Sequence, residues 1–357
     1  MQTMNRIFFY TALLLLCACE PAGKDAPENT DTPREEEMPN DAVFYRGADL
    51  SYVNEMVDCG AIYYNESGNP EDPYAIFSKA GTDLIRVRLW HQPDWTDYSD
   101  YEDVKKTISK AKALGMQVLL DFHYSDDWTD PGKQKVPAAW LPVVNDTQLL
   151  GDSLYNYTYH VLNKLNKTGL LPEFIQVGNE INAEILQDPG KNYHHINWAR
   201  NATLINRGIQ AVRDASSEFG KNIQVMLHIA QPENGLWWFE QAKKNGISDY
   251  DWIGLSYYPL WSSYTIDNLP AAIETLIKTY HKRLMVVETA YPFTLNNADD
   301  ANNILDSNAL ITGYPASAKG QYDYLKALEK SITSAGGEGL IYWEPAWVST
   351  SCRTQWG

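Results

Sequence analysis

Cysteine is scarce in this sequence, with four among 357 residues. Cys17 and Cys19 lie close to the start of the chain, so only Cys59 and Cys352 remain for the body of the protein. This count excludes a disulfide framework and a cysteine-rich metal site. It leaves two alternatives open: one bridge between Cys59 and Cys352, or two buried free thiols.

Positive charge is also in short supply. There are 29 Lys and Arg residues against 46 Asp and Glu, a formal net charge of −17. Arg6 is the only charged residue before Cys19, so removal of that segment would leave 28 − 46 = −18. Such a surface repels phosphate backbones, which excludes nucleic-acid binding as a function class. The acidity alone selects no substrate.

The chain lacks an apolar run long enough to span a bilayer. The run from Ile7 to Leu16 is too short for that and follows Arg6, as in a secretory signal peptide. Leu16-Cys17-Ala18-Cys19 resembles a bacterial lipobox. We therefore expect residues 1–18 to be a lipoprotein signal peptide and Cys19, rather than Cys17, to be lipidated. Plain signal cleavage nearby is the alternative.

Residues 20–40 contain no aromatic or branched aliphatic side chain, but four prolines and the acidic run Glu35-Glu36-Glu37. Such a segment cannot build a core, so residues 19–43 are predicted to be a disordered acidic linker. About 20 flexible residues span roughly 25 Å. We expect an exported bacterial lipoprotein at the cell surface or outer membrane, held to the membrane through its lipid anchor only.

After the linker, short apolar runs alternate with longer segments of helical period, which is typical of a parallel sheet with crossover helices. Eight such strands predict an α/β fold of the (β/α)8 TIM barrel type, with residues 44–357 as a single catalytic domain. The predicted strands are Phe44–Asp49, Leu84–Trp90, Met116–His123, Phe174–Asn179, Ile223–Ile229, Trp252–Tyr257, Leu284–Glu288 and Leu340–Trp343.

Amphipathic periodicity predicts helices between the strands. The chain ends at Gly357, soon after Trp343, where a complete barrel carries its eighth helix. We therefore expect the last helix to be missing, either through C-terminal truncation or because this variant lacks it. The predicted helices lie near Val104–Leu114, Leu154–Leu165, Ile196–Val212, Leu269–Tyr280 and Tyr322–Ile332.

Catalytic residues of such barrels lie where strands end. Two predicted strands end in a lone glutamate: Glu180 follows Asn179 on the fourth strand, and Glu288 closes the seventh. These strands face each other across a barrel mouth, and two carboxylates about 5 to 5.5 Å apart cleave glycosidic bonds with retention. A salt bridge or a solvated loop is the alternative for either glutamate alone. Together they predict a glycoside hydrolase.

The same strand ends carry further motifs that resemble glycoside hydrolase family 53, the endo-β-1,4-galactanases of clan A. The resemblance implies retaining endo-hydrolysis of β-1,4-galactosidic bonds in galactan or type I arabinogalactan of plant pectin. It extends from Arg46 to Trp356. Its motifs are Arg46 to Asp49, Arg86 to Trp90, Leu120 to Trp128, Gln176 to Glu180, Gly254 to Pro259, Val287 to Pro292 and Tyr342 to Trp347.

The resemblance also implies individual roles. Glu180 would be the general acid/base and Glu288 the nucleophile, while Asn179 would bond the 2-hydroxyl of the sugar at the cleavage point. A tyrosine of the Tyr257-Tyr258 pair should orient Glu288, and we favour Tyr258 because strand alternation places it on the same side as Ser256.

Other strand-end residues are predicted to bind substrate. We expect Trp343 to be the sugar platform at the cleavage point, because the C–H faces of a pyranose stack on an aromatic ring. His123 has no partner at metal-ligand spacing, so it is not interpreted as a zinc ligand. The remaining candidates are Trp90, Trp128 and Trp347, which would extend the platform unless they only pack, and Asp49, Arg88, Asp121 and His123 near the sugar.

No cofactor is required by this chemistry. Some members of the family bind calcium after the seventh strand, and here Asp299 and Asp300 offer oxygen ligands in that region. A structural calcium site near them stays open, since the expected glycine-interrupted spacing is absent.

Two rival functions remain. Another clan A endo-glycanase, such as a mannanase or a cellulase, would share the barrel and both glutamates. A non-catalytic surface lipoprotein that binds glycans would suit the tether but has no need of two opposed carboxylates. We expect a monomer that acts on galactan.

Overall fold

The computed structural model describes residues 43–352. The predicted signal peptide, the predicted lipidation site Cys19 and the predicted linker up to residue 42 lie outside these residues, as does Trp356. Within the described part of the chain, no helix combines the length and the apolar character needed to cross a membrane.

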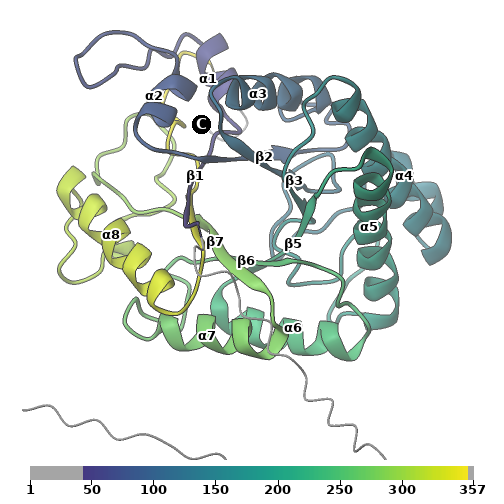
Figure 1. The fold of residues 1–357 in the computed structure, drawn as a ribbon. Helices are drawn as coiled ribbons and strands as arrows, with labels where there is room; N and C mark the ends of the chain where they lie inside the picture. Colours follow the sequence, from purple (N-terminus) through teal and green to yellow (C-terminus); the bar gives the residue numbers. More distant parts are fainter. Residues whose placement is uncertain (1–42, 353–357) are drawn as a thin grey trace, which may run out of the picture. The chain divides into compact units, whose positions relative to one another are not determined.

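Eight parallel strands close into a barrel in sequence order, so β1 pairs with both β2 and β8 (Figure 1). The predicted TIM barrel is confirmed, and each predicted strand overlaps an observed one. The strands are β1 Tyr45–Asp49, β2 Leu84–Leu89, β3 Gln117–Phe122, β4 Phe174–Val177, β5 Gln224–Ala230, β6 Trp252–Ser256, β7 Arg283–Thr289 and β8 Gly339–Tyr342.

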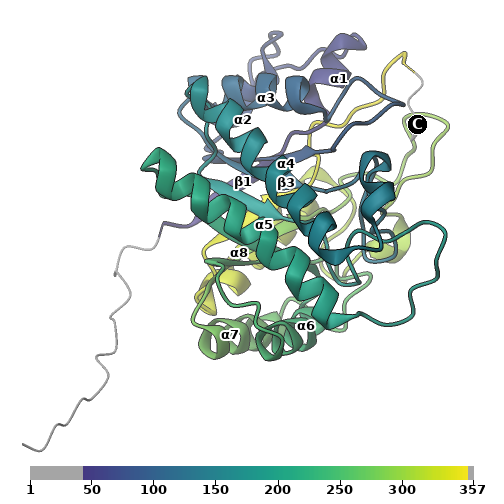
Figure 2. The same cartoon turned by 90° about the vertical axis from the view of Figure 1, so that its right-hand side faces the viewer.

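Helices surround the strands, and the loops that follow the strands gather at one end of the barrel (Figure 2). No helix follows β8 up to residue 352. The helices are α1 Val53–Asp58, α2 Pro73–Lys79, α3 Tyr101–Ala113, α4 Thr147–Lys167, α5 Trp198–Phe219, α6 Pro232–Lys244, α7 Leu269–Tyr280 and α8 Ala318–Ser334, with 3-10 turns at Ala138–Val143 and Ser307–Ala309.

Three of these helices, α1, α2 and α6, were not predicted from the sequence. The first two are short helices of six and seven residues that follow β1. In α6 the apolar residues Leu236, Trp237, Trp238 and Phe239 follow one another directly, so the helical period is hidden. Trp238 and Phe239 are buried, whereas Trp237 lies on the exposed side of the same helix.

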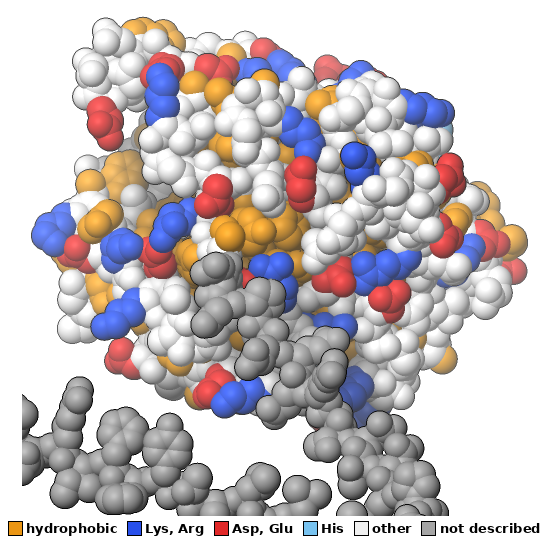
Figure 3. Space-filling view, viewed as in Figure 1, with side chains coloured by type: hydrophobic (Ala, Val, Ile, Leu, Met, Phe, Trp, Pro, Cys, Tyr) orange, Lys and Arg blue, Asp and Glu red, His pale blue; other side chains and the backbone are white. Residues whose placement is uncertain are grey.

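The core has two apolar layers. One lies between the barrel and its helices. On the surface shown in Figure 3, charged side chains of both signs surround a central apolar area. The second layer fills the inside of the barrel with large side chains. Gly47 leaves room for them, because a Cβ atom there would lie 2.7 Å from Cγ1 of Ile341. The inner layer consists of Leu84, Leu119, Phe174, Met226, Trp252, Met285, Val287 and Ile341.

A disulfide joins Cys59, at the end of α1, to Cys352 after β8. Of the two alternatives that the sequence left open, the structure contains the bridge. The bridge ties the segment after the last strand to the connection after the first strand. It therefore fastens the polypeptide where the barrel closes.

We expect Gly47→Ala to lower the free energy of unfolding by about 1–3 kcal/mol, because the added methyl group would overlap Ile341 and the packed interior cannot expand freely. Urea unfolding measures this change. Gly132→Ala is the matched control: it lies in an exposed turn where the nearest atom is 3.4 Å from the added Cβ, and it should change stability by less than about 0.5 kcal/mol. Equal effects would contradict this account of the interior.

Candidate active site

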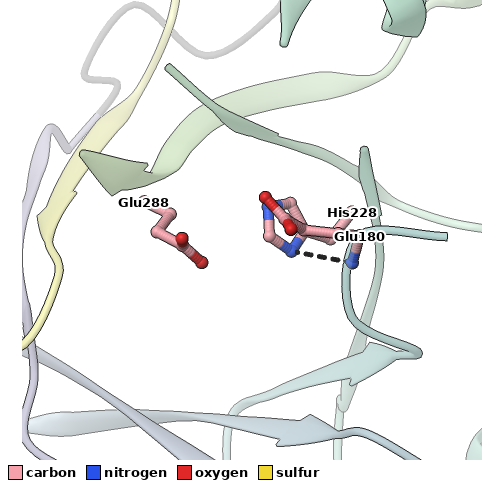
Figure 4. A group of neighbouring side chains, drawn as sticks. All are labelled: Glu180, His228 and Glu288. Carbon is pink, nitrogen blue, oxygen red and sulfur yellow. Dashed lines mark hydrogen bonds between the residues drawn. The ribbon is translucent and has the colours of Figure 1, made fainter. Parts of the chain in front are cut away.

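Glu180 and Glu288 meet at the mouth of the barrel. Glu180 lies just beyond β4, where Gly178 and Glu180 itself have positive φ angles of 87° and 44°, and Glu288 lies within β7. A carboxylate oxygen of each glutamate and a ring nitrogen of His228 all lie within 4.8 Å of one another (Figure 4). The two carboxylates are therefore close enough for a retaining mechanism, in which no water needs to fit between nucleophile and sugar.

The surroundings of Glu180 favour its protonated form. Burial, and next the negative charge of Glu288, raise the pKa of Glu180 to about 8. The hydroxyl of Ser256 donates to Oε1 of Glu180 at 2.6 Å, which opposes the shift only in part. At neutral pH this carboxyl carries a proton that it can give to a leaving group.

Glu288 has partners that favour its ionised form. Burial raises its pKa, but the positive charge of Arg86 and a hydrogen bond from Tyr258 oppose the rise. The hydroxyl of Tyr258 donates to Oε1 at 2.9 Å, and Nη1 of Arg86 donates to Oε2 at 3.2 Å. Within residues 43–352 no Lys or Arg donates a hydrogen bond to the carboxylate of Glu180. The protonated form is therefore favoured more at Glu180 than at Glu288, which is the difference that a proton donor and a nucleophile require.

Arg86 is the centre of a buried charge network that the sequence analysis did not single out. Its guanidinium donates at 2.8 Å to Asp49, Asp121 and Asn179, and at 3.2 Å to Glu288. These partners come from four different strands or strand ends around the barrel. The guanidinium thus fixes the amide of Asn179 and the carboxylate of Glu288 relative to each other.

A signal for this network exists in the sequence. Arg86 and Arg88 alternate along β2, so both side chains point to the same side of the sheet, into the barrel. A buried arginine requires acidic partners. Arg88 pairs with Glu344 at 3.1 Å and lies 4.1 Å from the ring centroid of Trp128.

Four of the residues predicted to bind substrate lie below the pocket instead. Asp49, Arg88, Asp121 and His123 are buried and do not line it. Their polar groups take part in the charge networks under the site. That they contact sugar stays a prediction. Burial lowers the pKa of His123 and thereby keeps its ring neutral.

The side chains of Tyr258 and Tyr257 have different surroundings, as strand alternation predicts. Tyr258 reaches Glu288, whereas Tyr257 is buried and its hydroxyl donates to the carbonyl of Tyr264 at 3.0 Å. Tyr257 therefore packs in this structure, and its binding of substrate stays a prediction. The favoured choice of Tyr258 agrees with its hydrogen bond to Glu288.

Aromatic rings form one wall of the site. Trp343 lines a cavity of about 340 Å³ together with Glu180 and Glu288. The rings of Trp128 and Trp347 stand edge-on to Trp343, with centroids 6.4 Å and 5.9 Å away. Trp90 is only 1% exposed and stands edge-on to Trp128, so in this structure it packs, which is the alternative that the sequence left open.

The residues near the site do not fit a metal. His228 joins the two glutamates in a group with metal-ligand atom types, but its Nδ1 lies 3.0 Å from Oδ1 of Asn179 and its Nε2 lies 2.8 Å from the hydroxyl of Ser256. Both ring nitrogens are thus engaged with protein groups. Burial, and next the charge of Arg86, lower the pKa of His228 well below its usual value and leave the ring neutral.

A calcium site near Asp299 and Asp300 stays a prediction. Oδ1 of Asp299 accepts from the backbone N–H of Ala301 at 2.9 Å, and Oδ2 accepts from the hydroxyl of Ser349. Across residues 43–352, the only group of three converging His, Cys, Asp or Glu side chains is the one at Glu180. Asp299 and Asp300 do not assemble such a group.

Comparison with known proteins shows two similar galactanases. The chain is 58% identical over 315 residues to a protein of Cellvibrio japonicus (strain Ueda107) named arabinogalactan endo-beta-1,4-galactanase, covering 88% of this chain and 83% of that one. It is 34% identical over 371 residues to the endo-beta-1,4-galactanase of Bacillus subtilis (strain 168), covering 97% and 82%.

Among solved structures, the GH53 catalytic domain of Ignisphaera aggregans superposes with a TM-score of 0.78 at 32% identity, covering 87% of each chain. Residues 45–357 match the family model described as Glycosyl hydrolase family 53. The chain therefore belongs to glycosyl hydrolase family 53.

Proposed function

We propose that this protein hydrolyses internal β-1,4-galactosidic bonds in galactan or type I arabinogalactan, with retention of configuration, and releases galacto-oligosaccharides. The observation that carries the proposal is the pair Glu180 and Glu288, within 4.8 Å of each other and in unlike surroundings. The relatives named as galactanases support galactan as the substrate.

In the first step, the carboxylate of Glu288 attacks the anomeric carbon while Glu180 gives its proton to the glycosidic oxygen. A bond forms between a Glu288 oxygen and the anomeric carbon, and the bond from that carbon to the leaving oxygen breaks. Arg86 and Tyr258 hold the nucleophile in place through their hydrogen bonds. Before the attack, the charge of Glu288 helps to keep Glu180 protonated.

In the second step, water attacks the anomeric carbon and releases Glu288. Once Glu288 is esterified it carries no charge, so a principal cause of the raised pKa of Glu180 disappears. Glu180, now ionised, takes a proton from the water. Two inversions at one carbon give net retention, and neither step uses a cofactor.

Two further residues serve the sugar at the cleavage point. The amide of Asn179 donates to the carbonyl of Thr129 at 2.8 Å and accepts from Arg86, which leaves one N–H for the 2-hydroxyl of the sugar. The ring of Trp343 provides a stacking face in the same cavity. Both contacts favour the flattened, positively charged sugar of the transition state.

We further propose that the protein is exported as a monomeric lipoprotein, lipidated at Cys19 and held at the cell surface or outer membrane by residues 19–43. The short apolar run, the cysteine that follows it and the acidic, proline-containing linker support this proposal. It suits an enzyme whose polymeric substrate cannot enter the cell.

Glu288→Gln should lower kcat on galactan by about 10³-fold or more, because an amide cannot form the covalent intermediate. Release of reducing ends from pectic galactan, with mannan and cellulose as alternative substrates, measures this. Glu240→Gln, an exposed glutamate on α6, is the control and should keep wild-type activity. Unchanged turnover by Glu288→Gln, or a wild-type protein that cleaves only mannan or cellulose, would contradict the proposed function.

Glu180→Gln should lower kcat/KM on galactan by about 10²- to 10⁴-fold, and far less on an aryl β-galactobioside with an acidic leaving group, because such a group departs without a proton. The wild-type kcat/KM on galactan should fall as the pH rises through about 8, where Glu180 loses its proton. The variant should lack this basic limb, since glutamine does not titrate. Equal losses on both substrates would argue against the acid role.

Cys19→Ser should abolish membrane retention of the protein in a bacterial host while leaving its activity intact, because the substitution removes the acylated sulfur and lies far from the catalytic residues in sequence. Detergent-phase partitioning and labelling with a radioactive fatty acid measure this. Cys17→Ser is the matched control and should retain the label. Label that follows Cys17 instead would overturn the choice of Cys19.

A further inference from the structure

The imidazole ring of His228 is a buried titratable group that the mechanism above does not use. It belongs to β5, is fully buried and does not line the cavity that contains Glu180 and Glu288. Its Nε2 lies 2.8 Å from the hydroxyl of Ser256, and that hydroxyl donates to Oε1 of Glu180 at 2.6 Å. The ring can therefore affect the reaction only through its neighbours, and Ser256 connects it to the acid.

The backbone of Glu180 also rests on His228. Glu180 has a φ angle of 44°, in the left-handed region, which a residue with a side chain adopts only when its surroundings hold it there. Its backbone N–H donates to Nδ1 of His228 at 3.4 Å, the bond drawn in Figure 4. The N–H of Ile181 donates to the backbone carbonyl of His228 at 3.0 Å. His228 thus contacts the acid at its backbone and, through Ser256, at its carboxyl.

These hydrogen bonds decide which ring nitrogen carries a proton. Burial, and next the charge of Arg86, lower the pKa of His228 well below its usual value, so the ring is neutral and has a single N–H. A backbone N–H can only donate, so the Nδ1 that faces Glu180 accepts. An amide N–H of Gln176 lies 3.1 Å from Nδ1 and 3.3 Å from Oδ1 of Asn179, within reach of both acceptors. The ring proton is then on Nε2.

A proton on Nε2 fixes the direction of the bonds through Ser256. The hydroxyl accepts from Nε2 and has one proton of its own, which it gives to Oε1 of Glu180. In the protonated carboxyl, Oε1 is then the carbonyl oxygen and the acid proton is on Oε2. Within residues 43–352 no protein group bonds Oε2, which leaves it for the leaving oxygen. A proton on Nδ1 would reverse these bonds, and Glu180 would direct its proton at Ser256.

We propose that His228 is a positioning residue for the acid: its Nε2–H orients the hydroxyl of Ser256 and so keeps the transferable proton of Glu180 on Oε2. The inference rests on the proposed function and deepens it. The position of this proton matters only when the leaving group needs protonation. His228 should therefore assist cleavage of galactan, whose leaving sugar needs a proton, more than cleavage of a substrate with an acidic leaving group.

The kinetic test uses His228→Phe, which keeps a buried ring but has no N–H. Its kcat/KM should fall by about 10- to 100-fold on galactan and by less than about threefold on an aryl β-galactobioside with an acidic leaving group. His228→Gln, whose amide can donate to Ser256, should recover part of the loss. His91→Phe is the matched control: this histidine side chain is 6% exposed and faces Asp126, and the ratio of the two values should stay within about twofold of wild type.

Two further measurements separate positioning from support of the fold. Because the ring acts through the hydroxyl, His228→Phe combined with Ser256→Ala should lose no more kcat/KM on galactan than Ser256→Ala alone. NMR of the wild-type protein, labelled with heavy nitrogen in histidine, should show His228 as a neutral ring protonated at Nε2. The signals that disappear in His228→Phe or His228→Gln identify this ring. Thermal unfolding checks that each variant folds.

Three outcomes would overturn this assignment. Equal losses on both substrates in His228→Phe would show that the ring only supports the fold. Additive losses in the double variant would show that it does not act through Ser256, and a ring protonated at Nδ1 would reverse the direction of the bonds. A wild-type enzyme without activity on galactan would instead refute the proposed function, whereas an active wild type with any of the three outcomes refutes only the role of His228.

Discussion

The buried guanidinium of Arg86 is the interaction on which the site depends. An isolated charge at this depth would be strongly unfavourable, so the barrel surrounds it with the carboxylates of Asp49, Asp121 and Glu288. These residues come from β1, β3 and β7, and Arg86 itself from β2. Neutralising one cation thus requires strands from opposite sides of the barrel to be in register. The orientation of the nucleophile is a consequence of that requirement.

The same network makes two chemically identical side chains different. Glu288 shares the positive charge of Arg86 through a direct hydrogen bond, while Glu180 is bonded by the neutral hydroxyl of Ser256. The charge of Glu288 also acts on Glu180, because their carboxylates lie close together in a largely buried site. The charge of Glu288 therefore favours the protonated form of Glu180. In the proposed mechanism this effect disappears when Glu288 becomes an ester, and Glu180 can then ionise. One carboxyl can act first as an acid and then as a base.

The interior of the barrel is divided along its axis. Large apolar side chains such as Phe174 and Trp252 fill the layer near the start of the strands, and the polar network lies above them toward the strand ends. The apolar layer supplies packing that does not depend on the site. Above the network, Trp343 and Trp261 line the cavity that contains Glu180 and Glu288. Stability and sugar binding are thus carried by different layers of the same eight strands.

The sequence by itself determined the barrel and the two glutamates, because the alternation of apolar runs with helical segments is local and a lone charge at a strand end breaks it. Galactan entered through the family resemblance. Only the tertiary structure decided which polar and aromatic residues face the sugar. Trp90 and Trp261 both follow strands, yet one is covered and the other open. Burial depends on what distant strands and loops place over a residue, and no short stretch of sequence records that.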